Sequence, residues 1–349
     1  MKIQSTLSSY VMENFEEVSE FLYNWYNHNE KELYQEYCTN DSLPEWKKEL
    51  IGLKFGFLEY ELLKLNIFKY LTLMDQNNSN IILFLGEAYK VGKDVKQDYT
   101  KAIDYYMKSI EMGNRYALRK LGNCYYYGNG VDKDYKKAVE YYKKAAELGH
   151  SYALNDLGIC YHNGKGVDQD YIKAIEYYTK AAELGNSSSL NNLGCCYHNG
   201  DGVDKDYKKA IEYYEKAAEL GNRDALNTLG ICYHNGDGVD KDYIKAIEYY
   251  TKAAELGNSS SLNNLGTCYH NGDGVDKDYK KAIEYFKKAA ESGNNYAFKN
   301  LGTYYYYGKG VDKDYIKAIE YYKKAAELGN SDALIGLKNI PEEKRNVVE

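Results

Sequence analysis

The chain has 349 residues, a formal net charge of −7 and a mixed composition rich in charged residues. This composition predicts a chain that folds in water, and the length suits either two ordinary domains or one long repeat array. The slightly acidic balance argues against a nucleic-acid groove, which needs a basic stripe, and against a polybasic membrane anchor.

The N-terminal region, residues 1–79, carries no repeat and is predicted to form a helical cap or a small partner-binding module. Two amphipathic patterns, at residues 8–29 and 44–75, are separated by the turn-forming sequence CTNDSLP. The first residues lack the apolar core of a secretory signal, and the sequence holds no run of about twenty apolar residues. We therefore expect a cytoplasmic protein without a membrane partner, whose cysteines are free thiols.

From residue 80 onward the sequence repeats with a fixed period. Leu-Gly pairs recur every 36 residues, from Leu85-Gly86 to Leu301-Gly302. A fixed period in this range indicates stacked supersecondary units. The predicted units are residues 80–113, 114–149, 150–185, 186–221, 222–257, 258–293 and 294–329, followed by a C-terminal capping helix at 330–340 and a tail at 341–349.

Each unit contains two amphipathic helical patterns, which predict an antiparallel helix pair. In a first helix, Ala225 and Leu229 share an apolar face, and in a second helix Ile211 and Tyr214 do so. Small residues such as Gly230 allow the two helices to approach each other closely.

The predicted helix ends carry the expected capping residues. Asn222 and Asp206 are predicted N-caps of a first and a second helix, and His150 stands where other units have asparagine. Gly236 follows the last turn of its helix, where a left-handed residue closes it. Gly238 then permits a tight connection.

The residue types of the loop motif CYHNGDGVDKDY resemble those of a ligand site, but the motif is predicted to be only the turn that connects the two helices of a repeat. Cys196 and His198 project about 200° apart on a helix, and the equivalent cysteines recur once per unit, so they cannot converge on one zinc ion. In an EF-hand register that starts at Asp201, Val203 and Lys205 occupy ligand positions. The GDG sequence lacks the strand and the Lys-Ser/Thr of a phosphate loop. We predict no metal, no cofactor and no catalytic residue.

The repeated string LGxCYxxGxGVDxDYxKAIEYYxKAAELGNxxAL resembles the Sel1-like repeat (SLR), a relative of the tetratricopeptide repeat. The resemblance covers residues 80–340. It implies an all-α fold, a right-handed α/α superhelical solenoid that serves protein–protein interaction as a scaffold or adaptor. The matching residues of one unit are Ala225, Leu229, Gly230, Tyr233, Gly236, Gly238, Val239, Asp242, Lys245, Ala246, Tyr250, Lys252, Ala253, Ala254, Glu255 and Gly257.

Two other functions stay open at this point. Some secreted members of the family carry two cysteines per repeat and have been assigned β-lactamase activity, so a secreted-type hydrolase is one alternative. This chain has one cysteine in most repeats. An effector that acts on host-cell proteins, in the host cytoplasm, is the other alternative.

The face of the first helix opposite its apolar stripe is the candidate partner-binding surface. The resemblance places this face on the concave side of a superhelix. An asparagine side chain offers both a donor and an acceptor, so a row of them suits an extended peptide held by its main chain. Arginine and lysine at the N-terminal end suit an acidic group, and a merely solvated helix surface is the alternative. The candidate residues are Asn155, Asn191, Asn192, Asn227, Asn263, Asn264, Asn300, Arg115, Arg119 and Lys120.

The array also contains a near-exact duplication. Residues 157–192 and 229–264 are identical except at two positions, which indicates duplication of a two-repeat, 72-residue block. We expect the duplicated surfaces to bind alike, so Asn191→Ala and Asn263→Ala are expected to weaken binding equally.

Overall fold

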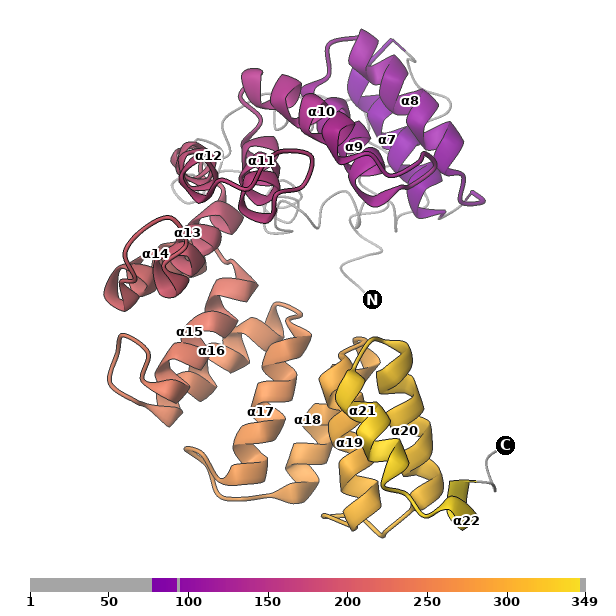
Figure 1. Cartoon of the computed structure of the whole chain (residues 1–349), viewed down its shortest axis with the longest axis vertical. Coiled ribbons are helices and arrows are strands. Elements are labelled where there is room, and N and C mark those ends of the chain that lie inside the picture. The colour runs from indigo at the N-terminus through magenta and orange to yellow at the C-terminus, as the bar shows by residue number, and fades with distance from the viewer. Residues whose placement is uncertain (1–76, 93–94, 346–349) are drawn as a thin grey trace, which may run out of the picture. The chain divides into compact units, whose positions relative to one another are not determined.

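The computed structural model describes residues 77–92 and 95–345, which form sixteen helices and no strand (Figure 1). The chain divides into two compact units, unit 1 at residues 1–189 and unit 2 at residues 190–349. The predicted cap lies almost entirely outside the described residues.

The described helices alternate between first and second helices of successive repeats. The first helices are α7 (Ser79–Val91), α9 (Arg115–Tyr127), α11 (Ser151–Asn163), α13 (Ser187–Asn199), α15 (Arg223–Asn235), α17 (Ser259–Asn271) and α19 (Asn295–Tyr307). The second helices are α8 (Tyr99–Glu111), α10 (Tyr135–Glu147), α12 (Tyr171–Glu183), α14 (Tyr207–Glu219), α16 (Tyr243–Glu255), α18 (Tyr279–Glu291) and α20 (Tyr315–Glu327). Two shorter helices follow, α21 (Ser331–Lys338) and α22 (Glu342–Arg345).

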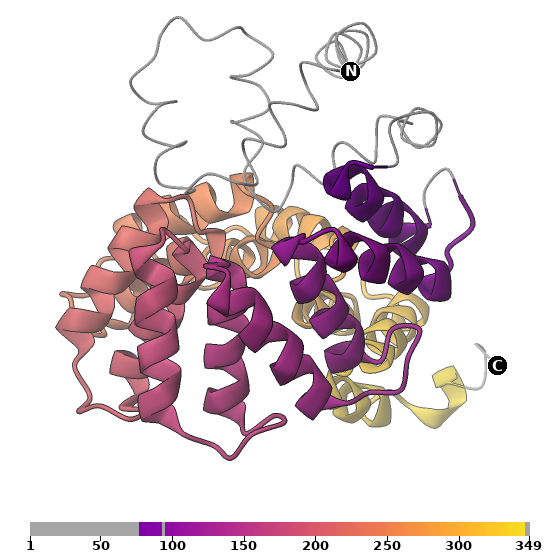
Figure 2. The ribbon, with the colours of Figure 1, turned by 90° about the horizontal axis from the view of Figure 1, so that it is seen from above.

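Within each unit the helices pack in chain order. The two helices of a repeat pack on each other, and each second helix packs on the first helix of the next repeat, as α8 does on α9 and α16 does on α17. The view from above shows the same succession for the indigo to magenta helices of the first repeats (Figure 2). This confirms the predicted fold class, an all-α array of helix-pair repeats.

The Leu-Gly pair of each first helix positions the aromatic ring of its second helix. A Cβ atom on Gly230 would lie 2.5 Å from ring carbons of Tyr250, so only glycine lets this ring lie against the backbone of α15. The buried ring hydroxyl then meets a side chain that differs between repeats. Tyr142 donates to Asn123 Oδ1 (2.7 Å), whereas the Tyr322 hydroxyl pairs with Thr303 Oγ1 (3.1 Å).

The helix ends and the loop confirm the predicted turn between the two helices of a repeat. The Asn222 side chain accepts hydrogen bonds from the N–H groups of Asp224 and Ala225, and Gly236 adopts a left-handed conformation with φ 87°. Gly238, with φ 78°, faces the first residue of the preceding second helix, because a Cβ atom there would lie 2.7 Å from Tyr207 Cβ. The second glycine of the loop is therefore a contact between repeats as well as a turn residue.

His150 is the exception among the described first-helix caps for which the cap geometry is known. It occupies the N-cap of α11 without a side-chain cap hydrogen bond. The ring is buried and meets the Tyr116 ring edge-on, with 4.6 Å between centroids. Burial holds the pKa of His150 well below its usual value, and the positive charges of Arg119, Arg115 and Lys120 lower it further.

His150→Asn is expected to stabilise the protein by about 1 kcal/mol near neutral pH, because asparagine accepts the missing cap hydrogen bond. The unfolded chain binds a proton at His150 as the pH falls through about 6.5, whereas the folded chain does not, so wild-type stability falls with pH. The advantage of the variant should therefore grow by about 1 kcal/mol between about pH 7.5 and 5.5. Urea unfolding at both pH values measures this, and an advantage independent of pH would contradict a neutral buried ring.

Candidate partner-binding surface

The three predicted basic residues each contact another part of unit 1. Arg119 Nε lies 2.6 Å from Asp156 Oδ2, and Arg115 donates to the Leu148 carbonyl oxygen at 2.9 Å. Lys120 Nζ lies 3.3 Å from Glu87 Oε2. The positive charge that the sequence places here is thus balanced, for Arg119 and Lys120, by carboxylates of neighbouring repeats.

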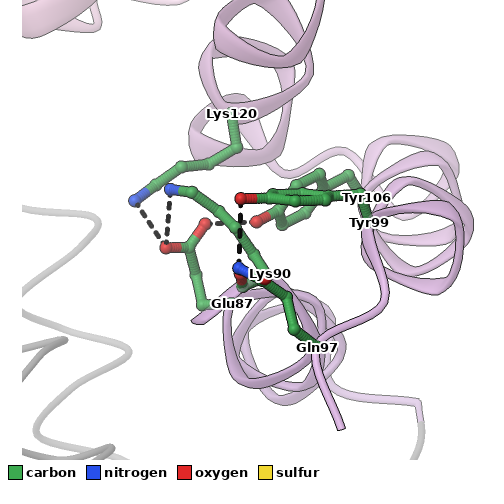
Figure 3. A network of polar contacts seen from close by, with 6 residues as sticks. All are labelled: Glu87, Lys90, Gln97, Tyr99, Tyr106 and Lys120. Carbon is green, nitrogen blue, oxygen red and sulfur yellow. Dashed lines mark hydrogen bonds and ion pairs between the residues drawn. The ribbon is translucent and has the colours of Figure 1, made fainter. Parts of the chain in front are cut away.

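Glu87 is the centre of a buried polar network between α7, α8 and α9 (Figure 3). The ammonium groups of Lys120 and Lys90, the latter at 3.4 Å, both pair with its Oε2 atom, and its Oε1 atom accepts a hydrogen bond from the Tyr106 hydroxyl. Burial raises the pKa of Glu87, but the two lysines and the hydroxyl outweigh it and lower the pKa to about 2. This role was not predictable from the repeat pattern, because Glu87 stands where other repeats carry uncharged residues such as Ile159.

The predicted asparagine row is joined by hydrogen bonds between successive first helices. In unit 1, Asn155 Oδ1 accepts from Ser189 Oγ at 2.8 Å. In unit 2, Asn227 Oδ1 accepts from Ser261 Oγ at 2.8 Å and from Asn264 Nδ2 at 3.0 Å.

The same bond recurs one repeat further on, where Asn263 Oδ1 accepts from Asn300 Nδ2 at 3.0 Å. Asn192 also takes part in an interaction within the structure. We name the row formed by Asn227, Asn263, Asn264 and Asn300 the amide ladder of unit 2.

Asn191 breaks this pattern. Its Oδ1 atom is buried and has no hydrogen-bond partner in the described part of the chain. The reason lies in the next repeat, where Ala225 and Thr228 replace the two donors, Ser261 and Asn264, that serve Asn227. The Thr228 hydroxyl instead donates to the carbonyl oxygen of its own helix at Asp224. The duplicate of Asn191 is Asn263, which does accept a hydrogen bond from Asn300, so the two halves of the duplication are not equivalent at this junction.

Thr228→Asn is expected to stabilise unit 2 by about 1–2 kcal/mol, because it supplies the amide donor that Asn191 lacks. Thr228→Val is the matched control, since it has a similar shape but no donor, and it should give no gain. The midpoint of urea unfolding measures both variants. Equal midpoints for the two variants would show that the missing hydrogen bond to Asn191 Oδ1 does not reduce the stability of unit 2.

Stacked tyrosines form a second repeated surface feature. In one stack the rings of Tyr125 and Tyr141 lie 5.7 Å apart at 5°, with Lys137 over the first ring and Lys144 over the second. Both outer ring faces are thus covered by lysine, and the stack is a structural element rather than an open aromatic surface. The same stacking occurs at Tyr89/Tyr105, Tyr161/Tyr177, Tyr197/Tyr213, Tyr233/Tyr249, Tyr269/Tyr285 and Tyr305/Tyr321.

The cysteines form no chemical site among the described residues. All that are described are free, and burial raises the pKa of Cys160, Cys232 and Cys268 to about 12, which keeps these thiols protonated and unreactive. Within residues 77–92 and 95–345, no three histidine, cysteine or acidic side chains gather closely enough to hold a metal ion. In the same ranges, no helix has the length and apolar character needed to cross a membrane.

Family comparison gives a match along most of the repeat array. The model of the Sel1 repeat matches seven consecutive segments of the chain. They are residues 82–114, 115–150, 151–186, 187–222, 223–258, 259–294 and 299–330. No curated protein sequence matches the chain.

Solved structures show the same repeat. A Sel1 repeat protein from Oxalobacter formigenes is 35% identical over 72% of this chain and 99% of its own, with a TM-score of 0.63. A protective antigen of uropathogenic Escherichia coli, described as displaying an SLR fold, is 36% identical over 79% of this chain, with a TM-score of 0.56. This chain spans only 60% of the length of that antigen. Yeast Tom70, at 15% identity and a TM-score of 0.53, shares the fold alone.

Proposed function

Because the chain belongs to the Sel1 repeat family, we propose that it is a non-catalytic scaffold or adaptor that binds partner proteins along the polar face of its first helices. Sel1 repeat proteins are generally protein-interaction scaffolds. The chain's own support for the proposal is the amide ladder of unit 2, in which Asn227, Asn263, Asn264 and Asn300 line successive helices. A row of neutral amides that repeats with the fold suits an elongated partner better than a small molecule.

A cytoplasmic location and a protein or extended peptide partner are part of the same proposal. The buried, protonated thiols of Cys160 and Cys232 support a structural role for the repeated cysteines. Arg119 pairs with Asp156 and Lys120 pairs with Glu87 within the chain. The proposed partner-binding residues are therefore the asparagines rather than these two basic residues.

Affinity capture from cytosol with three baits tests the proposal. The first is the intact chain, and the second carries Asn191→Ala, Asn227→Ala and Asn263→Ala. The third is a matched control with Asn199→Ala, Asn235→Ala and Asn271→Ala. These last three residues end the same three helices, α13, α15 and α17.

Partners of the intact chain should be lost from the ladder bait and kept by the control bait. Circular dichroism must show that all three baits are folded at the capture temperature. Partners that survive on both variant baits would move the binding surface away from the first helices and contradict the proposal.

A further inference from the structure

Asparagine followed by glycine is a chemically labile pair, because the main-chain nitrogen of the unhindered glycine can attack the asparagine side chain. The sequence contains five such pairs. Four of them end the first helices of the middle repeats, at Asn163, Asn199, Asn235 and Asn271. The fifth, Asn129-Gly130, lies in the loop between α9 and α10. The fold therefore places the same pair of residues in two different surroundings.

The reaction at such a pair exchanges the side-chain amide for a carboxylate. The glycine nitrogen attacks Cγ of asparagine, a new C–N bond forms, and the bond from Cγ to the side-chain nitrogen breaks. The proton of the glycine N–H leaves with that nitrogen as ammonia, and a five-membered cyclic imide remains. Water that then cleaves the new bond gives aspartate. Water that cleaves the original main-chain bond gives isoaspartate, whose main chain runs through Cβ and Cγ.

The four helix-end pairs are held by the hydrogen bonds that close their helices. The Gly200 N–H donates to the Cys196 carbonyl oxygen at 2.8 Å. The same bond, to the cysteine four residues earlier, is made by Gly164, Gly236 and Gly272. The peptide plane between asparagine and glycine has to rotate before the nitrogen reaches Cγ, and this rotation breaks the closing bond. Attack at these pairs therefore requires local opening of the helix end.

Asn129 is not held in this way. Within residues 77–92 and 95–345, neither the Gly130 N–H nor the Asn129 side chain makes a hydrogen bond. Only the Asn129 N–H is engaged, by the Cys124 carbonyl oxygen at 2.9 Å, so the peptide plane that has to rotate is free. Gly130 is exposed and Asn129 is half-buried, which gives water access to both.

The following repeats carry no asparagine at this place. Their equivalent residues are Lys165, Asp201, Asp237, Asp273 and Lys309. Lysine cannot form the imide, and an ionised carboxylate is a poor target for a nucleophile. Asn129 is therefore the reactive member of this set of loops.

The loop at Gly130 also forms a contact between the first two repeats. A Cβ atom on Gly130 would lie 2.6 Å from Tyr99 Cβ and 3.1 Å from Ile103 Cδ1, so the main chain packs closely on α8. Aspartate at position 129 leaves the main chain unchanged, and Asp201 occupies the same place in a later repeat. Isoaspartate inserts an extra carbon atom into the main chain next to Gly130, which a close-packed contact does not accommodate.

We propose that Asn129 is a site of spontaneous deamidation, and that its isoaspartate product loosens the junction between the first two repeats. The reaction needs water and no enzyme, and it converts this pair ahead of the four pairs at helix ends. Neither part depends on the proposed binding function, because both concern the covalent structure of the chain.

Ageing the folded full chain in mildly alkaline buffer, followed by peptide mass spectrometry, tests the site. The peptide that contains Asn129 should exchange NH₂ for OH at least about tenfold faster than the peptides with the four helix-end asparagines. In urea, where the closing hydrogen bonds are lost, all five pairs should convert at similar rates. Similar rates in the folded chain, or an unchanged Asn129, would overturn the proposal.

Two variants test the effect on the junction. Aged wild type should accept methyl groups from a protein isoaspartyl methyltransferase, and aged Asn129→Gln should not do so at this loop, because glutamine does not readily form the imide. The thermal midpoint should fall with ageing in the wild type but not in Asn129→Gln. Fresh Asn129→Asp should unfold like fresh wild type, since it adds the charge without the extra carbon.

An aged wild type that carries isoaspartate at position 129 and unfolds like the fresh protein would overturn the proposed loosening. A midpoint that falls equally in fresh Asn129→Asp would assign the loss to the new charge, and it would overturn the role of the inserted carbon.

Discussion

Glu87→Gln is expected to lower the free energy of unfolding by about 3–5 kcal/mol, because it removes the negative charge that balances the ammonium groups of Lys120 and Lys90. Lys120 and Lys90 would keep their charges but lose the ion pair with this carboxylate. Glutamine preserves the size of the side chain, so the loss reports the charge and not a cavity. Urea unfolding followed by circular dichroism measures it.

Two controls make the result specific. Glu140→Gln changes an exposed residue of α10 and should alter stability by less than about 0.5 kcal/mol. Glu87→Leu combined with Lys120→Met replaces the pair by apolar side chains and should recover much of the loss. A double variant as unstable as Glu87→Gln would show that the lost charge balance is not the cause.

The same network makes stability depend on pH in a defined direction. The pKa of Glu87 is lowered from 4.5 to about 2, so its contribution is fully present above about pH 4.5 and is lost as the pH falls towards 2. The difference between the wild type and Glu87→Gln should therefore shrink by about 3 kcal/mol over this window. A difference that persists at pH 2 would contradict a buried ionised carboxylate.

Gly166→Ala is expected to destabilise the protein by about 3 kcal/mol or more, because two separate costs add. Gly166 has φ 75°, a left-handed conformation that costs an ordinary residue about 1–2 kcal/mol. Its Cβ atom would also lie 2.9 Å from the backbone nitrogen of Lys136, and backbone cannot move aside as a side-chain end can.

Gly164 in the same loop is the matched control. It has φ 64°, but a Cβ atom there would lie 3.4 Å from Gln169 Cβ, which is close to ordinary contact. Gly164→Ala should therefore cost only the left-handed conformation itself, about 1–2 kcal/mol. Thermal unfolding of both variants measures the gap, and equal losses would mean that the contact between repeats at Gly166 does not matter.

The period and the helix faces were predictable from sequence because both follow from spacing alone. Leu-Gly pairs fix the repeat length, and the Asn222 cap is a local signal that needs no tertiary information. The glycine in the pair predicted close helix packing, and the ring of Tyr250 against Gly230 confirms it.

The polar contacts between repeats were not predictable in this way. A spacing of 36 residues places Asn227 and Asn263 on the same face of successive first helices. Whether each of them accepts a hydrogen bond depends on the next repeat, where Asn264 and Asn300 supply the donors. Thr228 instead of an asparagine leaves Asn191 without a donor, and this follows only from side-chain geometry. Glu87 was not predictable because a buried charge that occurs in one repeat has no periodic signature.

The unequal junctions bear on how an array of near-copies folds in the right order. Helices α12 and α16 have the same sequence, YIKAIEYYTKAAE, so the side chains of either helix could pack equally well against the neighbours of the other. The pairs Glu87 with Lys120 and Arg119 with Asp156 occur at single junctions, and a helix docked one repeat out of place would bury a charge without its partner. Such a misdocked state costs several kcal/mol, so these two ion pairs disfavour misaligned packing of the helices that carry them.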